Sequence, residues 1–71
     1  MQIKLRIKVL LAERDWTQKD LAEITGLSTR LISDLANNKT KLYSKDALEK
    51  IIEAFGISDI NELIKIETGD K

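Results

Sequence analysis

The sequence predicts an all-α fold, a compact bundle of five helices with a small two-stranded sheet formed by the N- and C-terminal segments. The chain has 71 residues, of which 42% are apolar and 34% charged, as expected for one small globular domain. Apolar residues recur at helical spacing along most of its length. The chain has no cysteine and no histidine, so its stability must come from helix packing rather than from disulfides or zinc.

The N-terminal half contains an alternating segment followed by two helical ones. Residues 1–8 alternate apolar and polar side chains, which predicts a short strand that passes into a first helix over about residues 6–14. Thr17 is a favourable N-cap, and Asp20 three residues later completes a capping box. A second helix therefore begins at Thr17 and stops at Gly26.

The third and fourth helices are predicted over residues 28–37 and 44–55. Ser28 and Ser44 are the N-caps of these helices. Gly56 ends the fourth helix. The apolar residues of the fourth helix follow an i, i+3, i+4, i+7 pattern and comprise Leu48, Ile51, Ile52 and Phe55.

The C-terminal part predicts a short helix and a strand. Ser58 or Asp59 begins a fifth helix that runs through Leu63. Residues 64–67 alternate in polarity, so we expect them to pair with residues 2–6 as a two-stranded sheet. Residues 1–67 thus form a single domain, and residues 68–71 are expected to be frayed.

Composition excludes several function classes. Without histidine or cysteine the chain lacks the usual general base and thiol nucleophile, so we expect no enzyme, no metal and no cofactor. No apolar run is long enough for a membrane span, and nothing resembles a signal peptide. We therefore expect a cytoplasmic protein that does not contact membranes.

Charge is segregated although the net charge is zero. Residues 1–45 carry nine basic and five acidic groups, a net charge of +4, and residues 46–71 carry three basic and seven acidic groups, a net charge of −4. One face of the molecule can therefore be basic. Chance imbalance on solvated helices is an equally acceptable interpretation.

Residues 18–37 have the features of two helices that cross steeply over a tight turn. Ala22 is small where the two backbones would approach. Gly26 tolerates the positive φ that ends the first helix of this pair, the second helix of the chain. Apolar anchors occur on both helices, at Leu21, Leu27, Ile32 and Leu35.

Residues 16–40 resemble the Cro/C1-type helix-turn-helix of phage repressors and their bacterial relatives. The similarity lies in T-Q-x-x-L-A, then G-L-S, then N-x-K-T, and it continues through residues 48–63. It implies the lambda-repressor-like fold and a transcriptional regulator, a repressor, that binds specific sequences in double-stranded DNA. Asp15 and Asn38 stand where the family commonly has glycine; asparagine tolerates the left-handed turn.

The resemblance also implies residue roles. Gln18 matches a glutamine that contacts a DNA phosphate. Residues 28–37 match the recognition helix, which lies in the major groove. The loop that contacts the DNA backbone beyond this helix corresponds to Asn37, Lys39 and Thr40. Helix geometry agrees: if Ile32 and Leu35 are buried, the opposite face is polar. That face, with its N-terminal edge and cap, comprises Ser28, Thr29, Arg30, Ser33, Asp34 and Asn37.

Alternatives are open for individual side chains. Arg30 can pair with guanine, or form an i, i+4 ion pair with Asp34, or do both. Leu31 and Trp16 are interpreted as core residues rather than as a thymine contact and a stacking platform. The basic residues near the N-terminus (Lys4, Arg6, Lys8) are interpreted as a solvated face rather than as a DNA contact.

Two partner hypotheses follow. A small neutral monomer would bind DNA weakly, so we expect a homodimer on a pseudo-palindromic site, formed through the fifth helix or the terminal strands. The alternative is an antitoxin or protein-interaction module that uses the same fold, with the acidic residues 46–71 binding a basic protein partner.

Overall fold

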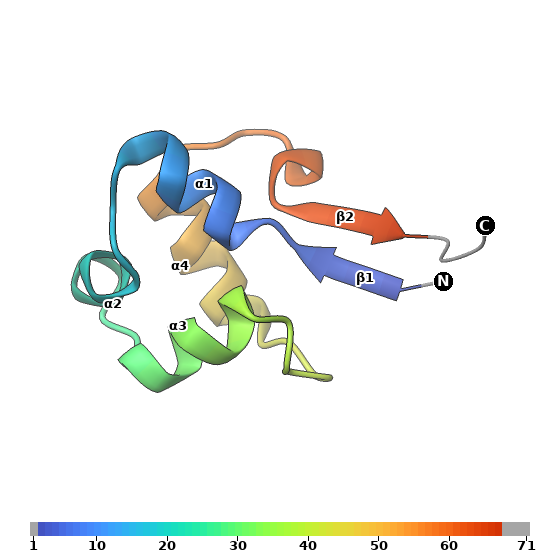
Figure 1. The fold of residues 1–71 in the computed structure, drawn as a ribbon, viewed down its shortest axis with the longest axis horizontal. Coiled ribbons are helices and arrows are strands. Elements are labelled where there is room, and N and C mark those ends of the chain that lie inside the picture. Colours follow the sequence, from blue (N-terminus) through green and yellow to red (C-terminus); the bar gives the residue numbers. More distant parts are fainter. Residues whose placement is uncertain (1, 68–71) are drawn as a thin grey trace.

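The computed structural model describes residues 2–67. Figure 1 shows the helices grouped together and a two-stranded ribbon that projects from them. In chain order the elements are β1 (Gln2–Leu5), α1 (Ile7–Arg14), α2 (Gln18–Thr25), α3 (Thr29–Ala36), α4 (Lys45–Phe55), the 3₁₀ turn η1 (Ile60–Glu62) and β2 (Ile64–Glu67). The predicted fraying of residues 68–71 lies outside the described residues.

The prediction of five helices was wrong for residues 2–67, which contain four α-helices. The expected fifth helix is the single 3₁₀ turn η1, capped by the Asp59 carboxylate, which accepts the Asn61 N–H at 2.9 Å. Leu63 is fully buried, and its carbonyl accepts the Arg6 N–H at 2.7 Å. Because the chain must enter the sheet at this point, too few residues remain for an α-helical nucleus.

The predicted helix starts are confirmed by their caps. At α2 the Asp20 N–H donates to the Thr17 hydroxyl at 3.1 Å, and the Thr17 N–H donates to the Asp20 carboxylate at 2.9 Å. Ser28 and Ser44 accept backbone N–H groups in the first turns of α3 and α4. These bonds satisfy donors that a helix start leaves unpaired.

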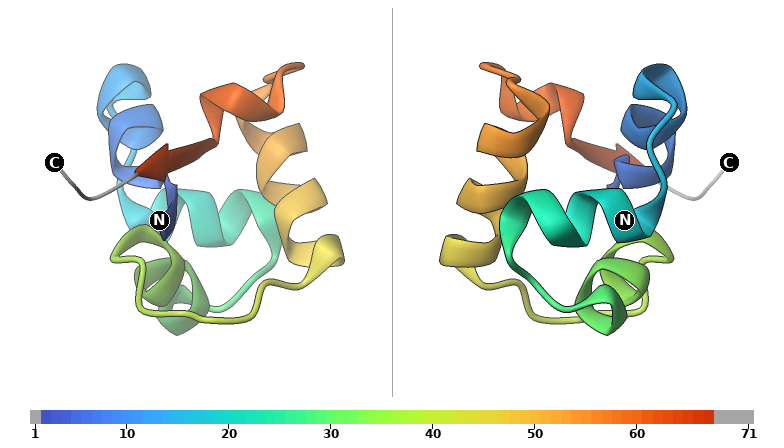
Figure 2. Two further views of the ribbon diagram at one scale, coloured as in Figure 1. Left: turned by 90° about the vertical axis from the view of Figure 1, so that its right-hand side faces the viewer. Right: turned by 90° about the vertical axis from the view of Figure 1, so that its left-hand side faces the viewer.

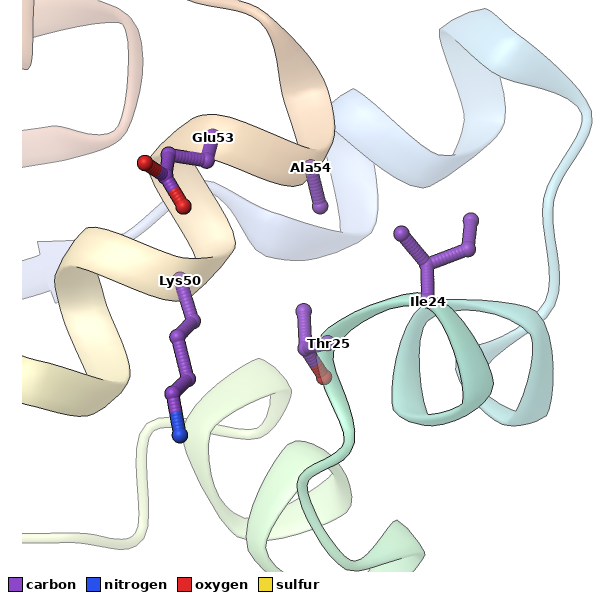
Figure 3. Close-up of a pocket in the computed structure, with 5 residues that line it drawn as sticks. All are labelled: Ile24, Thr25, Lys50, Glu53 and Ala54. Carbon is purple, nitrogen blue, oxygen red and sulfur yellow. The ribbon is translucent and has the colours of Figure 1, made fainter.

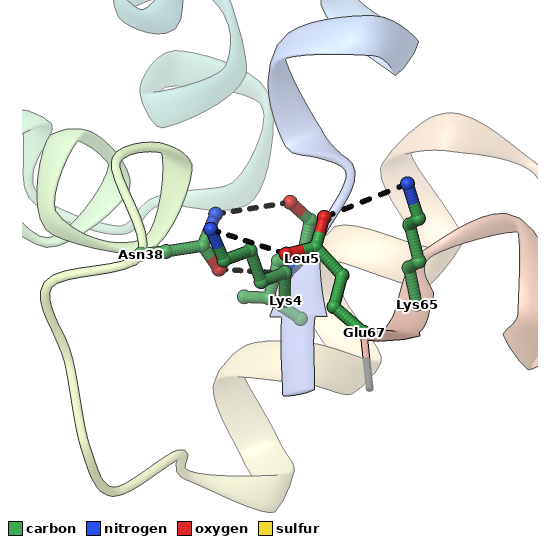
Figure 4. Close-up of polar contacts among 5 residues, drawn as sticks. All are labelled: Lys4, Leu5, Asn38, Lys65 and Glu67. Atoms are coloured by element: carbon green, nitrogen blue, oxygen red, sulfur yellow. Dashed lines mark hydrogen bonds and ion pairs between the residues drawn. The ribbon is translucent and has the colours of Figure 1, made fainter. Parts of the chain in front are cut away.

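The predicted pairing of the terminal segments is also confirmed. β1 and β2 are antiparallel, with Ile3 opposite Ile66 and Leu5 opposite Ile64. On the other face the Glu67 carboxylate lies 3.4 Å from Lys4 Nζ and 3.5 Å from Lys65 Nζ (Figure 4). Lys4 in particular, and Lys65 to a smaller degree, hold the pKa of Glu67 below its usual value.

One apolar core joins the helices to the base of the ribbon. Its buried members are Leu5, Ile7, Leu10, Leu11, Leu21, Ala22, Ile32, Leu35, Ala36, Ile51, Phe55, Ile57 and Leu63. Half-buried Trp16 stacks on Phe55 with the ring centroids 5.7 Å apart, which confirms that Trp16 belongs to the core. The Arg14 guanidinium lies over the same Phe55 ring and donates to the Phe55 carbonyl at 2.8 Å, so the C-terminal ends of α1 and α4 are joined.

Asn38 connects the end of α3 to β1. Its φ of +57° confirms the predicted left-handed turn. Its side-chain oxygen accepts the Leu5 N–H at 2.7 Å, and its amide nitrogen donates to the Leu5 carbonyl at 3.3 Å (Figure 4). The amide thus occupies the outer edge of β1 as a neighbouring strand would.

Replacing Ala22 by leucine tests the close helix contact. Ala22 is 6% exposed where α2 packs against its neighbours, so Ala22→Leu should overpack this contact and destabilise the fold by about 1–3 kcal/mol. Ala12, which is exposed on α1, provides the control: Ala12→Leu should leave the free energy of unfolding within about 0.5 kcal/mol. Equal effects of the two substitutions in urea denaturation would refute the close contact.

Replacing Asn38 by glycine tests the connection to β1. Asn38→Gly keeps the left-handed backbone but removes two hydrogen bonds, so we expect a loss of about 1–3 kcal/mol. Asp15 has nearly the same backbone conformation, with φ +58°, and Asp15→Gly should be nearly neutral by the same denaturation measurement. If Asn38→Gly is also neutral, the bonds to Leu5 contribute no stability.

Candidate nucleic-acid interface

The turn between α2 and α3 is built by local hydrogen bonds. Gly26 adopts φ +79°, and its N–H donates to the Ala22 carbonyl at 2.8 Å. The Thr25 hydroxyl donates to the Leu21 carbonyl at 2.8 Å and accepts the Leu27 N–H at 3.2 Å. A Cβ at Gly26 would meet no atom within 4 Å, so the positive φ is what favours glycine here.

The two helices cross steeply. In Figure 1 α2 is seen end-on while α3 runs across the view, and in Figure 2 the two exchange these orientations. Ile32 is fully buried and Leu35 is 2% exposed, so they fix the inner face of α3. Half-buried Leu31 packs against the same core, which confirms its interpretation as a core residue.

The outer face of α3 carries the polar residues that the sequence places there. Thr29, Arg30 and Asn37 are exposed, while Ser33 and Asp34 are half-buried. Arg30 is therefore neither packed inward nor covered by the acidic half of the chain. Among the ion pairs of residues 2–67, none joins Arg30 to Asp34.

The structure brings two of these side chains into direct contact. The Asn37 amide donates to the Ser33 carbonyl at 2.9 Å and to the Ser33 hydroxyl at 3.3 Å. Asn37 is the C-cap residue of α3, one turn beyond Ser33. The bonds orient both groups at the C-terminal end of the outer face.

The remaining predicted site residues flank α3. Gln18, half-buried, is the first residue of α2, and Ser28 uses its hydroxyl to cap α3 by accepting the Leu31 N–H at 3.1 Å. After α3, the exposed Lys39 donates its backbone N–H to the Asp34 carbonyl at 2.9 Å, and Thr40 is half-buried. The predicted site residues thus come from the start of α2, from α3 with its N-cap, and from the loop that follows α3.

Part of the acidic charge of α4 is neutralised on α4 itself. Glu49 pairs with Lys45 at 3.7 Å, and Asp46 pairs with Lys50 at 3.2 Å, each one turn apart. These exposed pairs contribute little stability. They do reduce the negative potential that the acidic half would exert on a polyanion.

The role of Asn38 was missed by the sequence prediction beyond its turn geometry. Its amide bonds Leu5, which lies 33 residues away in the sequence. A side-chain amide that follows a helix has the donor and acceptor needed to close a strand edge. No local pattern indicates which strand, because the contact exists only once the helices have packed.

A depression of about 390 Å³ lies between α2 and α4 (Figure 3). Its lining residues are Ile24, Thr25, Lys50, Glu53 and Ala54, none of which belongs to the predicted site. Within residues 2–67, no group of three or more acidic, histidine or cysteine side chains could hold a metal ion.

Comparison with known families assigns the fold. Residues 6–69 match a family model described as a Cro/C1-type HTH DNA-binding domain, which is most of the chain. No curated protein and no solved structure matches. In the part of the chain that the structure describes, no helix has the length and apolar character that crossing a membrane requires. With its helix pair, its exposed α3 face and this match, the chain belongs to the Cro/C1-type helix-turn-helix DNA-binding domain family.

Proposed function

We propose that the chain is a sequence-specific transcriptional regulator, a repressor that occludes its site, and that residues 28–37 enter the major groove of double-stranded DNA. The observation that carries this proposal is the two-sided character of α3. Ile32 and Leu35 anchor one side in the core, while Arg30 on the other side is exposed. A rigid helix with one polar, accessible face suits the dimensions of the major groove.

Base recognition centres on Arg30. Its guanidinium presents two parallel donors that match the O6 and N7 acceptors of guanine. Within residues 2–67 of the free chain no ion pair joins Asp34 to Arg30, so Asp34, one turn further on, either accepts a hydrogen bond from cytosine N4 or orients Arg30 only when DNA is bound. The neighbouring hydroxyl groups of Thr29 and Ser33 have the reach to contact either a base edge or a phosphate.

Phosphate contacts hold α3 in place. The N–H groups at the start of α2 favour an anion, and the capping box leaves those of Gln18 and Lys19 available. Gln18 and Ser28 contact one phosphate region before α3, and the loop after α3 contacts the next through Asn37, Lys39 and Thr40. These contacts supply affinity and position, without reading sequence.

Two copies bind together in this proposal. The net charge of zero and the small number of phosphate contacts give one copy weak affinity. A homodimer on a pseudo-palindromic site places two recognition helices about 34 Å apart and combines their contacts. A cytoplasmic location is part of the same proposal.

A second candidate function is an antitoxin or other protein-interaction module. It is favoured by exposed acidic side chains in the C-terminal part, among them Glu49, Glu53 and Glu62, which suit a basic protein partner. Salt titration separates the two functions. Duplex affinity that equals that of a neutral control protein at every salt concentration would favour the protein-interaction module.

Replacing Arg30 tests base recognition. After selection of the preferred site from random duplex DNA, Arg30→Ala should weaken binding by about 1–3 kcal/mol and relax preference at one base pair. Arg30→Lys keeps the charge but not the planar pair of donors, so it should lose the base preference with a smaller loss of affinity. If Arg30→Ala keeps both the affinity and the preference, α3 does not read DNA through this residue.

Replacing Lys39 tests backbone contact. Lys39→Ala should weaken binding to all duplexes equally and reduce the slope of log affinity against log salt by about 0.9. Lys39→Arg keeps the positive charge and should leave the slope unchanged. A sequence-dependent loss on Lys39→Ala would place this residue against bases instead of phosphates.

A further inference from the structure

We infer that the outer edge of β2 pairs with β2 of a second copy of this chain, antiparallel about a two-fold axis at Ile66. The two ribbons then form one four-stranded sheet. The inference rests on the proposed function only in that it names the surface of the proposed homodimer. Three observations carry it: an open strand edge, an uncovered apolar pair and a self-complementary charge pattern.

The open edge follows from the hydrogen bonds of Leu5. Both its N–H and its carbonyl bind Asn38, so they point away from β2. In an antiparallel ladder the directly opposite residue also points its groups outward, as does every second residue beyond it. The groups of Ile64 and Ile66 therefore face away from β1, and within residues 2–67 no strand lies beside them.

The two edges of the ribbon differ in a way that favours β2. At β1 the edge groups of Leu5 are already taken by Asn38. At β2 the backbone groups of Ile66 face outward by the alternation of the ladder, and among residues 2–67 no hydrogen bond outside the β1–β2 ladder uses them. Exposed edge strands are templates for pairing with another chain, and β2 is the edge with more groups to offer.

The apolar face of the ribbon extends beyond the core that covers it. Leu5 and Ile64, near the helices, pack against the core. Ile3 and Ile66, opposite each other at the outer end, are 53% and 62% exposed. A two-stranded ribbon is marginally stable alone, and further strands with a shared apolar face stabilise it. Pairing at β2 brings the two Ile66 side chains together between the two Ile3 side chains.

The charged residues of β2 favour one pairing register, and they favour a second copy of this chain as the partner strand. With Ile66 opposite its own copy, Lys65 lies opposite Glu67 of the second copy, and the symmetry creates this contact twice. Centring the axis on Lys65 instead would place two lysines opposite each other, which is unfavourable. Because the favourable pattern is complementary to itself, it indicates a second copy of this chain rather than an unrelated strand.

Pairing at this edge also reaches the recognition helix. Asn38, directly after the α3 C-cap, is bonded to β1, and β1 is bonded to β2. A continuous sheet through both copies thus links the two α3 helices. The link consists of the backbone hydrogen bonds of the sheet and, in each copy, the hydrogen bonds from Asn38 to β1. The dimer would hold them in a fixed relation for two half-sites.

Charge exchange tests the register without DNA. Lys65→Glu and Glu67→Lys each place like charges opposite each other twice in the homodimer, so each should dimerise at least about tenfold more weakly than the unmodified chain in sedimentation equilibrium. An equimolar mixture of the two variants pairs opposite charges again, so it should recover most of the original affinity. Thermal melts confirm that both variants are folded.

Amide hydrogen exchange tests the pairing of β2 in the unmodified chain, so the result does not depend on any substitution. The Ile66 N–H should exchange more slowly as the protein concentration rises, because it becomes bonded in the dimer. The Ile3 N–H, on the outer edge of β1, is the matched control and should not change.

Three results would overturn the inference. The unmodified chain could remain at its 8.1 kDa monomer mass at about 1 mM, where even a weak dimer forms. Either single variant could dimerise as tightly as the unmodified chain, or the mixture could fail to recover. A monomer that still binds its duplex would refute the homodimer and its surface but leave DNA binding by α3, and a dimer that ignores DNA would refute DNA binding but leave the dimer surface.

Discussion

The structure depends on the burial of one face of α3. Ile32 and Leu35 are removed from water against the neighbouring helices, and this burial is worth about 1.5–3 kcal/mol for each side chain. The short α3 would not be stable alone in water. Its position, and therefore the direction of every polar group on its outer face, is set by packing and not by the helix itself.

The ribbon compensates for the small size of the domain. With no cysteine to form a disulfide, the two ends of the described chain are joined by strand pairing and by the Arg6 to Leu63 hydrogen bond. Asn38 extends this arrangement to the residue that follows α3. The same ribbon that closes the fold thus supports α3, and its β2 edge is the surface at which we propose that a second copy binds.

Features of the fold that have a local cause could be predicted from the sequence. The caps at Thr17, Ser28 and Ser44 follow from side-chain chemistry a few residues away, and the left-handed Asn38 follows from its own conformational tolerance. The alternation at both ends predicted the sheet correctly. The 3₁₀ turn over residues 60–62 could not be predicted, because helical spacing is present there but the start of β2 shortens the helix to one turn. The bond from Asn38 to Leu5 could not be predicted, since it depends on how α3 and β1 pack.

We propose that the outer face of α3 lies against base edges in the complex with DNA. Solution NMR of the chain bound to its selected duplex tests this most directly, through nuclear Overhauser contacts between protein side chains and major-groove protons. We expect contacts from Arg30 and its neighbours Thr29 and Ser33 to cytosine H5 or thymine methyl protons. Groove contacts from α4 or the ribbon, with none from α3, would contradict this proposal.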